Sequence, residues 1–242
     1  MSALWLSLTL GLVAGLADFL GGFLLVRRSP SAKALRYFVA LGAGFMLAAA
    51  VLEMIPEGLH LNPQWTPLLI LAGYCGVHLL EHTLVPHFHF GEETHPHEFL
   101  SARKSYSVLF GLAMHTFFDG VAIGSGFVVS HWLGWVLFFA VFLHKLPEGF
   151  TVASVVLASG QSRRNAILAS GLLGAATLLG VLLTTLLESQ LKYALPLSGG
   201  VTLYVAATDL LPEVNREPNW RMALLVFVGV ASLLIMRRLF HV

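Results

Sequence analysis

Long apolar stretches, separated by short polar connections, run through the whole sequence and limit the folds open to this chain. Of its 242 residues, 57% are hydrophobic and only 11% are charged, which is outside the range of soluble globular proteins. A helix needs about 20 apolar residues to cross the hydrocarbon core of a bilayer. The sequence therefore predicts an all-α polytopic membrane protein with eight spans, over residues 3–26, 35–56, 67–86, 106–130, 132–158, 165–187, 195–212 and 220–240.

Basic residues are concentrated in every second connection between the predicted spans. Because positively charged connections tend to stay in the cytoplasm, this alternation places both chain termini on the outer side. Arg237 and Arg238, near the C-terminus, depart from the pattern. The net charge of +1 and the scattered basic residues give no indication of nucleic-acid binding. We therefore expect a single transmembrane domain over residues 1–242, in the lipid bilayer of a cell membrane, either an inner or a plasma membrane.

Two segments of the chain resemble each other: GAGFMLAAAVLEMIPEG (42–58) and GGVTLYVAATDLLPEV (199–214). Each is an apolar run that begins with Gly and closes on an acidic residue, two further residues and Pro-Glu. The segments lie in the second and seventh predicted spans, which cross the membrane in opposite directions. This arrangement is typical of the inverted repeats of transporters, although chance similarity between two apolar segments is an alternative.

Four ionisable residues in the fourth and fifth predicted spans form two pairs at helical spacing. His115 and Asp119 are four residues apart, as are His144 and Glu148, so each pair shares one helix face. A short turn near Ser130 joins the two spans, which makes them antiparallel neighbours. In such a hairpin, residues whose numbers have the same sum lie at the same depth. His115 should then be level with Glu148, and Asp119 with His144.

Two imidazoles and two carboxylates form a suitable ligand set for Zn²⁺ or another divalent cation. The two negative charges offset the charge of the metal, which lowers the free-energy cost of holding all these groups away from water. A single His or Asp inside a span is explained by a structural hydrogen bond between helices. Four ionisable groups at matched depth instead favour a functional site. We therefore predict a metal site formed by His115, Asp119, His144 and Glu148.

Three stretches of the sequence resemble the ZIP family, the zinc- and iron-regulated-transporter-like metal permeases. They are HTFFDGVAIG (115–124), HKLPEG (144–149) and YVAATDLLPE (204–213), and the eight-span layout is also similar. The resemblance implies a bundle of three, two and three spans, in which inverted repeats enclose the two central helices. It also implies transport of Zn²⁺, Fe²⁺, Mn²⁺ or Cd²⁺ toward the cytoplasm, commonly by a homodimer. The transport site of the family falls on the same four residues.

The sequence departs from this family at the positions where many members hold a second metal. Those members have an Asn after the His of the fourth span, an acid after the first polar residue of the fifth-span motif, and an acid in the sixth span. The corresponding residues here are Thr116, Lys145 and Ser170. A cationic side chain next to a cation site disfavours a second metal there. We therefore expect one metal, with Lys145 within reach of Glu148 three residues later.

Other polar residues lie toward the ends of the predicted path. Glu53 and Glu57 in the second span, with Asp209 and Glu213 in the seventh, are either ligands where the metal enters and leaves or interfacial charges beside proline helix ends. Met46 is either a soft auxiliary ligand or a packing residue. For the remaining intramembrane polar residues we favour hydrogen bonding between helices. These are Asp18, His78, Glu81 and His82.

The longest connection, residues 87–105, combines histidines with acidic residues and is predicted to face the cytoplasm. Such a connection either contacts divalent metal weakly or is an ordinary solvated loop. Its candidate metal contacts are His87, His89, His95 and His97.

The sequence favours a permease for divalent metal, with zinc as the first candidate and no cofactor besides the transported ion. An intramembrane zinc-dependent lipid hydrolase is an alternative, in which three of the ligands would hold a metal that activates water. The acids at both ends of the predicted bundle disfavour it, because a transport path would place them there. A metal sensor with its output in the His-bearing loop is a third possibility, but no signalling domain supports it.

Overall fold

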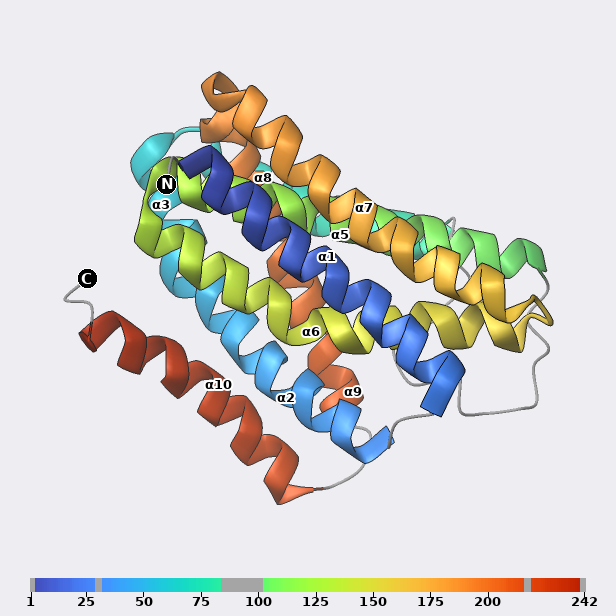
Figure 1. Ribbon diagram of the computed structural model, residues 1–242. Coiled ribbons are helices and arrows are strands. Elements are labelled where there is room, and N and C mark those ends of the chain that lie inside the picture. Colours follow the sequence, from blue (N-terminus) through green and yellow to red (C-terminus); the bar gives the residue numbers. More distant parts are fainter. Residues whose placement is uncertain (1–2, 29–31, 84–101, 216–218, 240–242) are drawn as a thin grey trace.

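The computed structural model describes residues 3–28, 32–83, 102–215 and 219–239, and these residues form helices with short connections and no β-strand. The loop histidines His87, His89, His95 and His97 lie outside the described residues. The helices are α1 (Ala3–Arg28), α2 (Ala32–Ala49), α3 (Ile55–Leu61), α4 (Thr66–Thr83), α5 (Ala102–Val129), α6 (His131–Ala158), α7 (Arg163–Leu186), α8 (Leu191–Tyr204), α9 (Leu211–Asn215) and α10 (Trp220–Leu239) (Figure 1).

Seven helical stretches in the described part of the chain are long and apolar enough to cross a membrane. The helix α4 is not one of them, because His78, Glu81 and His82 reduce its apolar character. It nevertheless occupies the place of the third predicted span. The beginning of α1 and the end of α10 lie at the same end of the bundle, as an even number of crossings requires (Figure 1). The chain is therefore an all-α integral membrane protein, as predicted from its hydropathy.

The helices α5 and α6 form a tight antiparallel hairpin, with Ser130 alone between them. The backbone of Ser130 is extended, and its side-chain oxygen accepts a hydrogen bond of 3.1 Å from the amide of Leu133. This N-cap satisfies one of the donors left free at the start of a helix. The sharp reversal fixes the relative depth of the residues on the two helices.

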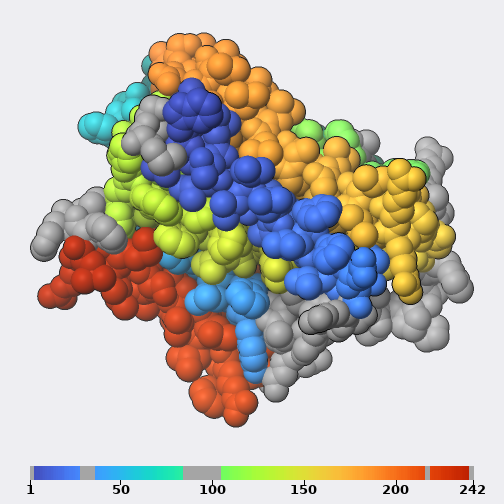
Figure 2. All heavy atoms as spheres, in the orientation of Figure 1, coloured from blue at the N-terminus to red at the C-terminus, as the bar shows by residue number. Residues whose placement is uncertain are grey.

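The helix α6 lies at the centre of the bundle and α10 at its edge. In the most apolar part of α6, 72% of the residues are buried, against 17% in α10. The helices α1 and α7 pack against one side of the α5–α6 hairpin, and α2 and α8 pack against the other. The space-filling view shows α1 and α7 across one face, with α10 along an edge (Figure 2). The hairpin that carries the predicted ligands is therefore enclosed by other helices.

The outer helices exchange partners in a reciprocal way. The helix α10 packs on α2, while α4 packs on α8; likewise α1 packs on α6, while α7 packs on α5. An inverted repeat of α1–α4 and α7–α10 would give the same exchange. The grouping of the spans into three, two and three stays a prediction.

A π-helical turn interrupts each of the two segments that resemble each other in sequence. The first covers Ala50–Met54 between α2 and α3, and the second covers Val205–Leu210 between α8 and α9. Both helices that follow have a proline in their first turn. The chain stays helical to Leu61 and Asn215, beyond the ends at 56 and 212 expected from the sequence.

Glycines allow the helices on one side of the bundle to approach closely. Gly15 of α1 and Gly174 of α7 pack backbone against backbone. Gly149 of α6 lies so close to the backbone of Asp18 in α1 that a Cβ atom would overlap with it. Small residues serve this purpose in membrane proteins because they let two helix axes come together. The second of these contacts places α1 beside the polar part of α6.

Candidate metal site

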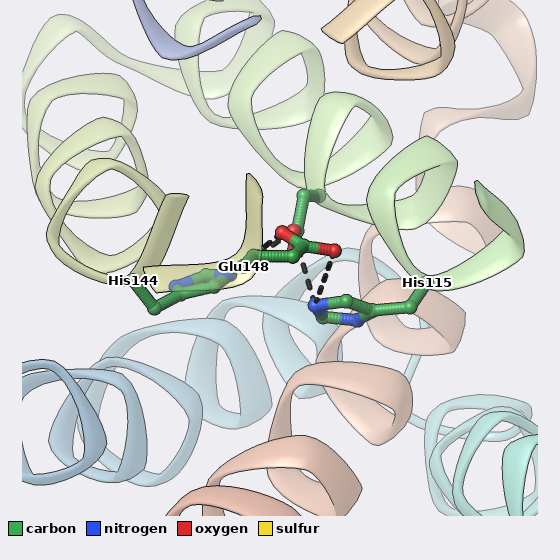
Figure 3. Close-up of side chains that lie close together, drawn as sticks. His115, His144 and Glu148 are labelled. Carbon is green, nitrogen blue, oxygen red and sulfur yellow. Dashed lines mark hydrogen bonds and ion pairs between the residues drawn. The ribbon is translucent and has the colours of Figure 1, made fainter. Parts of the chain in front are cut away.

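The hairpin brings together His115 and Asp119 from α5 with His144 and Glu148 from α6. Each residue offers one ligand atom, and these four atoms lie within 4.8 Å of one another. All four side chains are buried. In the close-up view the carboxylate of Glu148 lies between the rings of His115 and His144 (Figure 3). The geometry is that of a compact cluster able to surround one cation.

One oxygen atom, Oδ2 of Asp119, lies at the centre of the cluster. It is 3.3 Å from Nε2 of His115 and 3.2 Å from Nε2 of His144. The Glu148 carboxylate is slightly further away, with 4.0 Å from Oε1 to Nε2 of His115 and from Oε2 to Nε2 of His144. Both imidazoles therefore direct the same nitrogen toward the two acids, as ligands of a shared metal would.

Hydrogen bonds orient part of this ligand set. Nδ1 of His144 lies 3.0 Å from the carbonyl oxygen of Ala140, which leaves Nε2 directed into the cluster. The hydroxyl of Thr116 lies 2.6 Å from Oε1 of Glu148 and 2.7 Å from the carbonyl oxygen of Leu112. Outer hydrogen bonds of this kind fix the rotamer and tautomer of a metal ligand. By contrast, neither ring nitrogen of His115 has a hydrogen-bond partner among the residues that the structure describes.

The ammonium group of Lys145 lies against the acidic side of the cluster and is fully buried. Its Nζ atom is 2.7 Å from Oδ2 of Asp119 and 2.6 Å from Oε2 of Glu148. The sequence spacing predicted the contact with Glu148 but not the contact with Asp119. A buried cation thus balances part of the negative charge, without which two adjacent carboxylates would be strongly destabilising.

Two further candidates lie near the cluster or in the core without facing its centre. Ser170 is fully buried, and its hydroxyl is 3.1 Å from the carbonyl oxygens of both Gly149 and Ala166. The Ser170 hydroxyl therefore bonds to backbone oxygens, and one of them belongs to Gly149, the residue that follows Glu148. Met46 is fully buried in the hydrophobic core formed by α2, α6 and α8, which is the environment of a packing residue.

The acids at the ends of the predicted path have other partners. Glu53 accepts a hydrogen bond of 3.2 Å from the Trp132 indole and lies 3.2 Å from Nε of Arg237. Glu213 lies 3.7 Å from Nε of Arg36. Glu57 and Asp209 are half-buried, and the hydroxyl of Thr208 is 3.4 Å from Asp209. The structure does not bring these acids into the central cluster.

Two polar contacts were not anticipated as pairs from the sequence. Asp18 of α1 is fully buried, with Oδ2 at 3.7 Å from Nζ of Lys145. The hydroxyl of Tyr204 in α8 donates a hydrogen bond of 2.7 Å to Glu81 of α4. The sequence indicated Asp18 and Glu81, because each is an acid in an apolar span. Their partners, Lys145 and Tyr204, depend on how the helices pack. The second contact is an interhelix hydrogen bond, as we expected for Glu81.

Comparison with known proteins assigns the chain to a class. Residues 95–237, more than half of the chain, match the profile of the family described as ZIP Zinc transporter. This match includes both central motifs. The molecule is thus an integral membrane protein of the transporter class rather than an enzyme. The chain belongs to the ZIP zinc transporter family.

Individual relatives support the same assignment. The protein named Zinc transporter ZupT from Enterobacter sp. (strain 638) is 28% identical over 88% of this chain and 88% of its own length. The Zinc transporter ZupT of Salmonella heidelberg (strain SL476) is 28% identical over 95% of this chain and 96% of its own length. The human protein named Zinc transporter ZIP4 is 29% identical over 81% of this chain, which spans only 41% of that relative. The hydrolase alternative has no counterpart among these names.

Proposed function

We propose that this protein moves a divalent metal cation, zinc in the first place, across a cell membrane into the cytoplasm. One observation carries the proposal: four buried ligand atoms from His115, Asp119, His144 and Glu148 lie within 4.8 Å of one another at the centre of a membrane bundle. Ionisable groups in such a position mark a path for ions by default. The names of the relatives support zinc, and the resemblance to the family supports the inward direction.

The chemistry of the ligands fits a borderline metal ion. Imidazole nitrogen suits zinc, iron, copper and nickel, while carboxylate oxygen widens the set to manganese. The two acids neutralise a divalent charge in a site where water is scarce. Because a transport site must release its ion as well as bind it, mixed ligands serve better than a closed set of thiolates. We therefore include Fe²⁺, Mn²⁺ and Cd²⁺ among the ions that the site would accept.

We propose that the site holds one metal at a time. Lys145 stands where relatives with two metals have an acid, and its ammonium already contacts both carboxylates. Thr116 and Ser170 offer hydroxyl groups that are engaged with Glu148 and with backbone oxygens. Neither of these two positions supplies the negative charge that a second cation would require.

The proposal extends to the rest of the path and to the assembly. We propose that residues 1–242 act as one transport domain within a homodimer. Glu53 and Glu57 would lie where the metal enters, and Asp209 and Glu213 where it leaves. The loop histidines would collect released metal or adjust the rate, so their joint replacement should change transport kinetics without abolishing flux. They are His87, His89, His95 and His97.

Metal uptake by proteoliposomes tests the proposal. The purified chain is reconstituted into vesicles that enclose a fluorescent zinc indicator, and external Zn²⁺ is then added. We expect a saturable signal that empty vesicles lack and that His144→Ala removes. His131→Ala is the matched control, because His131 lies on the same helix but is exposed. Hydrolysis of the vesicle lipids without zinc flux would reject transport.

A further inference from the structure

We infer that Asp18 is the counter-ion that receives the Lys145 ammonium when a metal occupies the central site, an inference that rests on the proposed function. Lys145 is then a movable internal cation that alternates between two sets of carboxylates. In the structure it bridges Asp119 and Glu148. In the metal-bound protein it pairs with Asp18, which contributes to metal affinity without touching the metal.

The metal and the ammonium need the same oxygen atom. Oδ2 of Asp119 is the atom closest to both imidazole Nε2 positions, at 3.3 and 3.2 Å, and it is also 2.7 Å from Nζ of Lys145. A metal held by both imidazoles and Asp119 would therefore lie next to the ammonium. Two neighbouring cations repel each other strongly where little water screens their charges. Binding of the metal must displace the ammonium from Asp119.

A displaced ammonium requires another anion, because Lys145 is fully buried and cannot reach water. Asp18 is the carboxyl group best placed to receive it. The side chain of Asp18 is fully buried, and its Oδ2 atom is already 3.7 Å from Nζ. Neither oxygen of Asp18 accepts a hydrogen bond from any residue that the structure describes. A buried acid that lies beside a cation and has free acceptor capacity can take a hydrogen bond from that cation.

The movement required of Lys145 is small. A charge-assisted hydrogen bond between an ammonium and a carboxylate is about 2.7–2.9 Å long, so Nζ needs to move by roughly 1 Å toward Asp18. The flexible stem of lysine permits this without a change in the backbone. The close packing of Gly149 on the backbone of Asp18 holds the receiving carboxyl group beside Lys145. The same contact explains why a larger residue cannot stand at position 149.

The charges of the cluster balance in the metal-bound arrangement. Asp18, Asp119 and Glu148 together supply three negative charges, and Lys145 supplies one positive charge. A divalent cation adds two positive charges and brings the sum to zero. Without Asp18, the two remaining acids would face three positive charges. Asp18 is therefore a positioning residue for the lysine and a compensating charge for the whole site.

Zinc affinity in a double-mutant cycle tests the inference, using the purified full chain in detergent and calorimetric titration. We expect Asp18→Asn to weaken zinc binding about tenfold or more, because the ammonium then stays on Asp119 and Glu148. We expect Lys145→Met to strengthen binding, because the competing cation is gone. In the Lys145→Met background, Asp18→Asn should change the affinity by less than twofold. Ser7→Ala, a buried substitution on the same helix, is the control and should leave affinity unchanged.

Equal losses from Asp18→Asn in both backgrounds would overturn the inference, since Asp18 would then act on the metal or the fold directly. No loss in the unmodified background would overturn it as well. The proposed metal site is checked separately: the unmodified protein should bind zinc, and His144→Ala should not. If this holds while Asp18→Asn fails as described, the inference about Asp18 is wrong but the proposed function stands.

A metal-bound structure provides the second measurement if a variant does not fold. Crystals of the unmodified protein soaked in Cd²⁺ should show Nζ of Lys145 within hydrogen-bond distance of Asp18 and withdrawn from Asp119. An ammonium that remains between Asp119 and Glu148 beside the bound metal would refute the transfer.

Discussion

The hydroxyl of Thr116 on α5 lies 2.6 Å from the carboxylate of Glu148 on α6 and donates a hydrogen bond to it across the hairpin. The resemblance to the family places a second metal at the position of Thr116, but here its hydroxyl contacts Glu148, one of the proposed ligands of the first metal. The threonine thus satisfies Oε1 of the buried Glu148 carboxylate, while Lys145 contacts Oε2.

Thr116→Val removes the donor while keeping the shape of the side chain. A hydrogen bond to a charged group contributes about 1.5–3 kcal/mol, so we expect a lower thermal midpoint for the metal-free protein. Saturating zinc should reduce the difference, because the metal satisfies the same carboxylate. Thr177→Val is the control, since that buried hydroxyl bonds only to the carbonyl of Leu173 in its own helix. A difference that zinc leaves unchanged would mean that Thr116 acts through packing.

Replacing any one ligand of the central cluster should remove most transport. We expect His115→Ala, Asp119→Ala, His144→Ala and Glu148→Ala each to reduce zinc flux at least tenfold, because each deletes one of four ligands. The measurement is initial uptake in proteoliposomes, normalised to the amount of inserted protein. His131→Ala should transport normally. Wild-type flux in two or more of the four variants would reject the assigned site.

Metal affinity should fall as the medium becomes more acidic. An imidazole binds metal only in its neutral form, so protons compete with the metal for His115 and His144. Affinity is therefore expected to be highest above the range in which histidine titrates and to decrease as pH falls from about 8 to 5. Zinc titrations at several pH values, with the free metal buffered, provide the measurement. Affinity that rises as the pH falls would be incompatible with histidine ligands.

The number of metals at the centre should be one in this protein and two in a suitable variant. We expect anomalous scattering from crystals soaked in Cd²⁺ to show one central ion for each chain. Lys145→Asp combined with Ser170→Glu restores the acids present in relatives with two metals, and should admit a second, weaker ion. Two ions about 3.5–4 Å apart in the unmodified protein, the usual spacing of a paired site, would contradict the single-metal proposal.

A further prediction distinguishes two roles of Glu53, as a metal ligand or as the observed bridge between helices. It joins Trp132 of α6 to Arg237 of α10, so Glu53→Ala removes one hydrogen bond and one ion pair between these helices. We expect a lower thermal midpoint, a similar but smaller decrease for Trp132→Phe, and a KM for zinc within about twofold of wild type. Glu188→Ala, which replaces an exposed acid outside the proposed path, serves as the control. A KM raised tenfold in Glu53→Ala alone would instead assign Glu53 to metal capture.

Much of the fold could be predicted because hydrophobic length and helical spacing are properties of the sequence itself. The spans follow from apolar stretches, and the meeting of His115 with Glu148 follows from one sharp turn and a constant rise per residue. The Asp18–Lys145 pair could not be predicted in this way, because it depends on how closely α1 approaches α6 at Gly149. The bond between Tyr204 and Glu81 joins residues 123 positions apart, and no local pattern connects them.

The π-helical turns also left no mark on the hydropathy pattern, and they have a consequence for direction. A wider turn accommodates one residue more than an α-helical turn, so everything beyond it is rotated by about 100° around the helix axis. Glu53 and Asp209 both lie within such turns, and Glu57 and Glu213 follow them. Each span therefore presents one face to the bundle before the turn and another after it. Deleting a single residue there would keep the span helical yet aim its acid toward lipid.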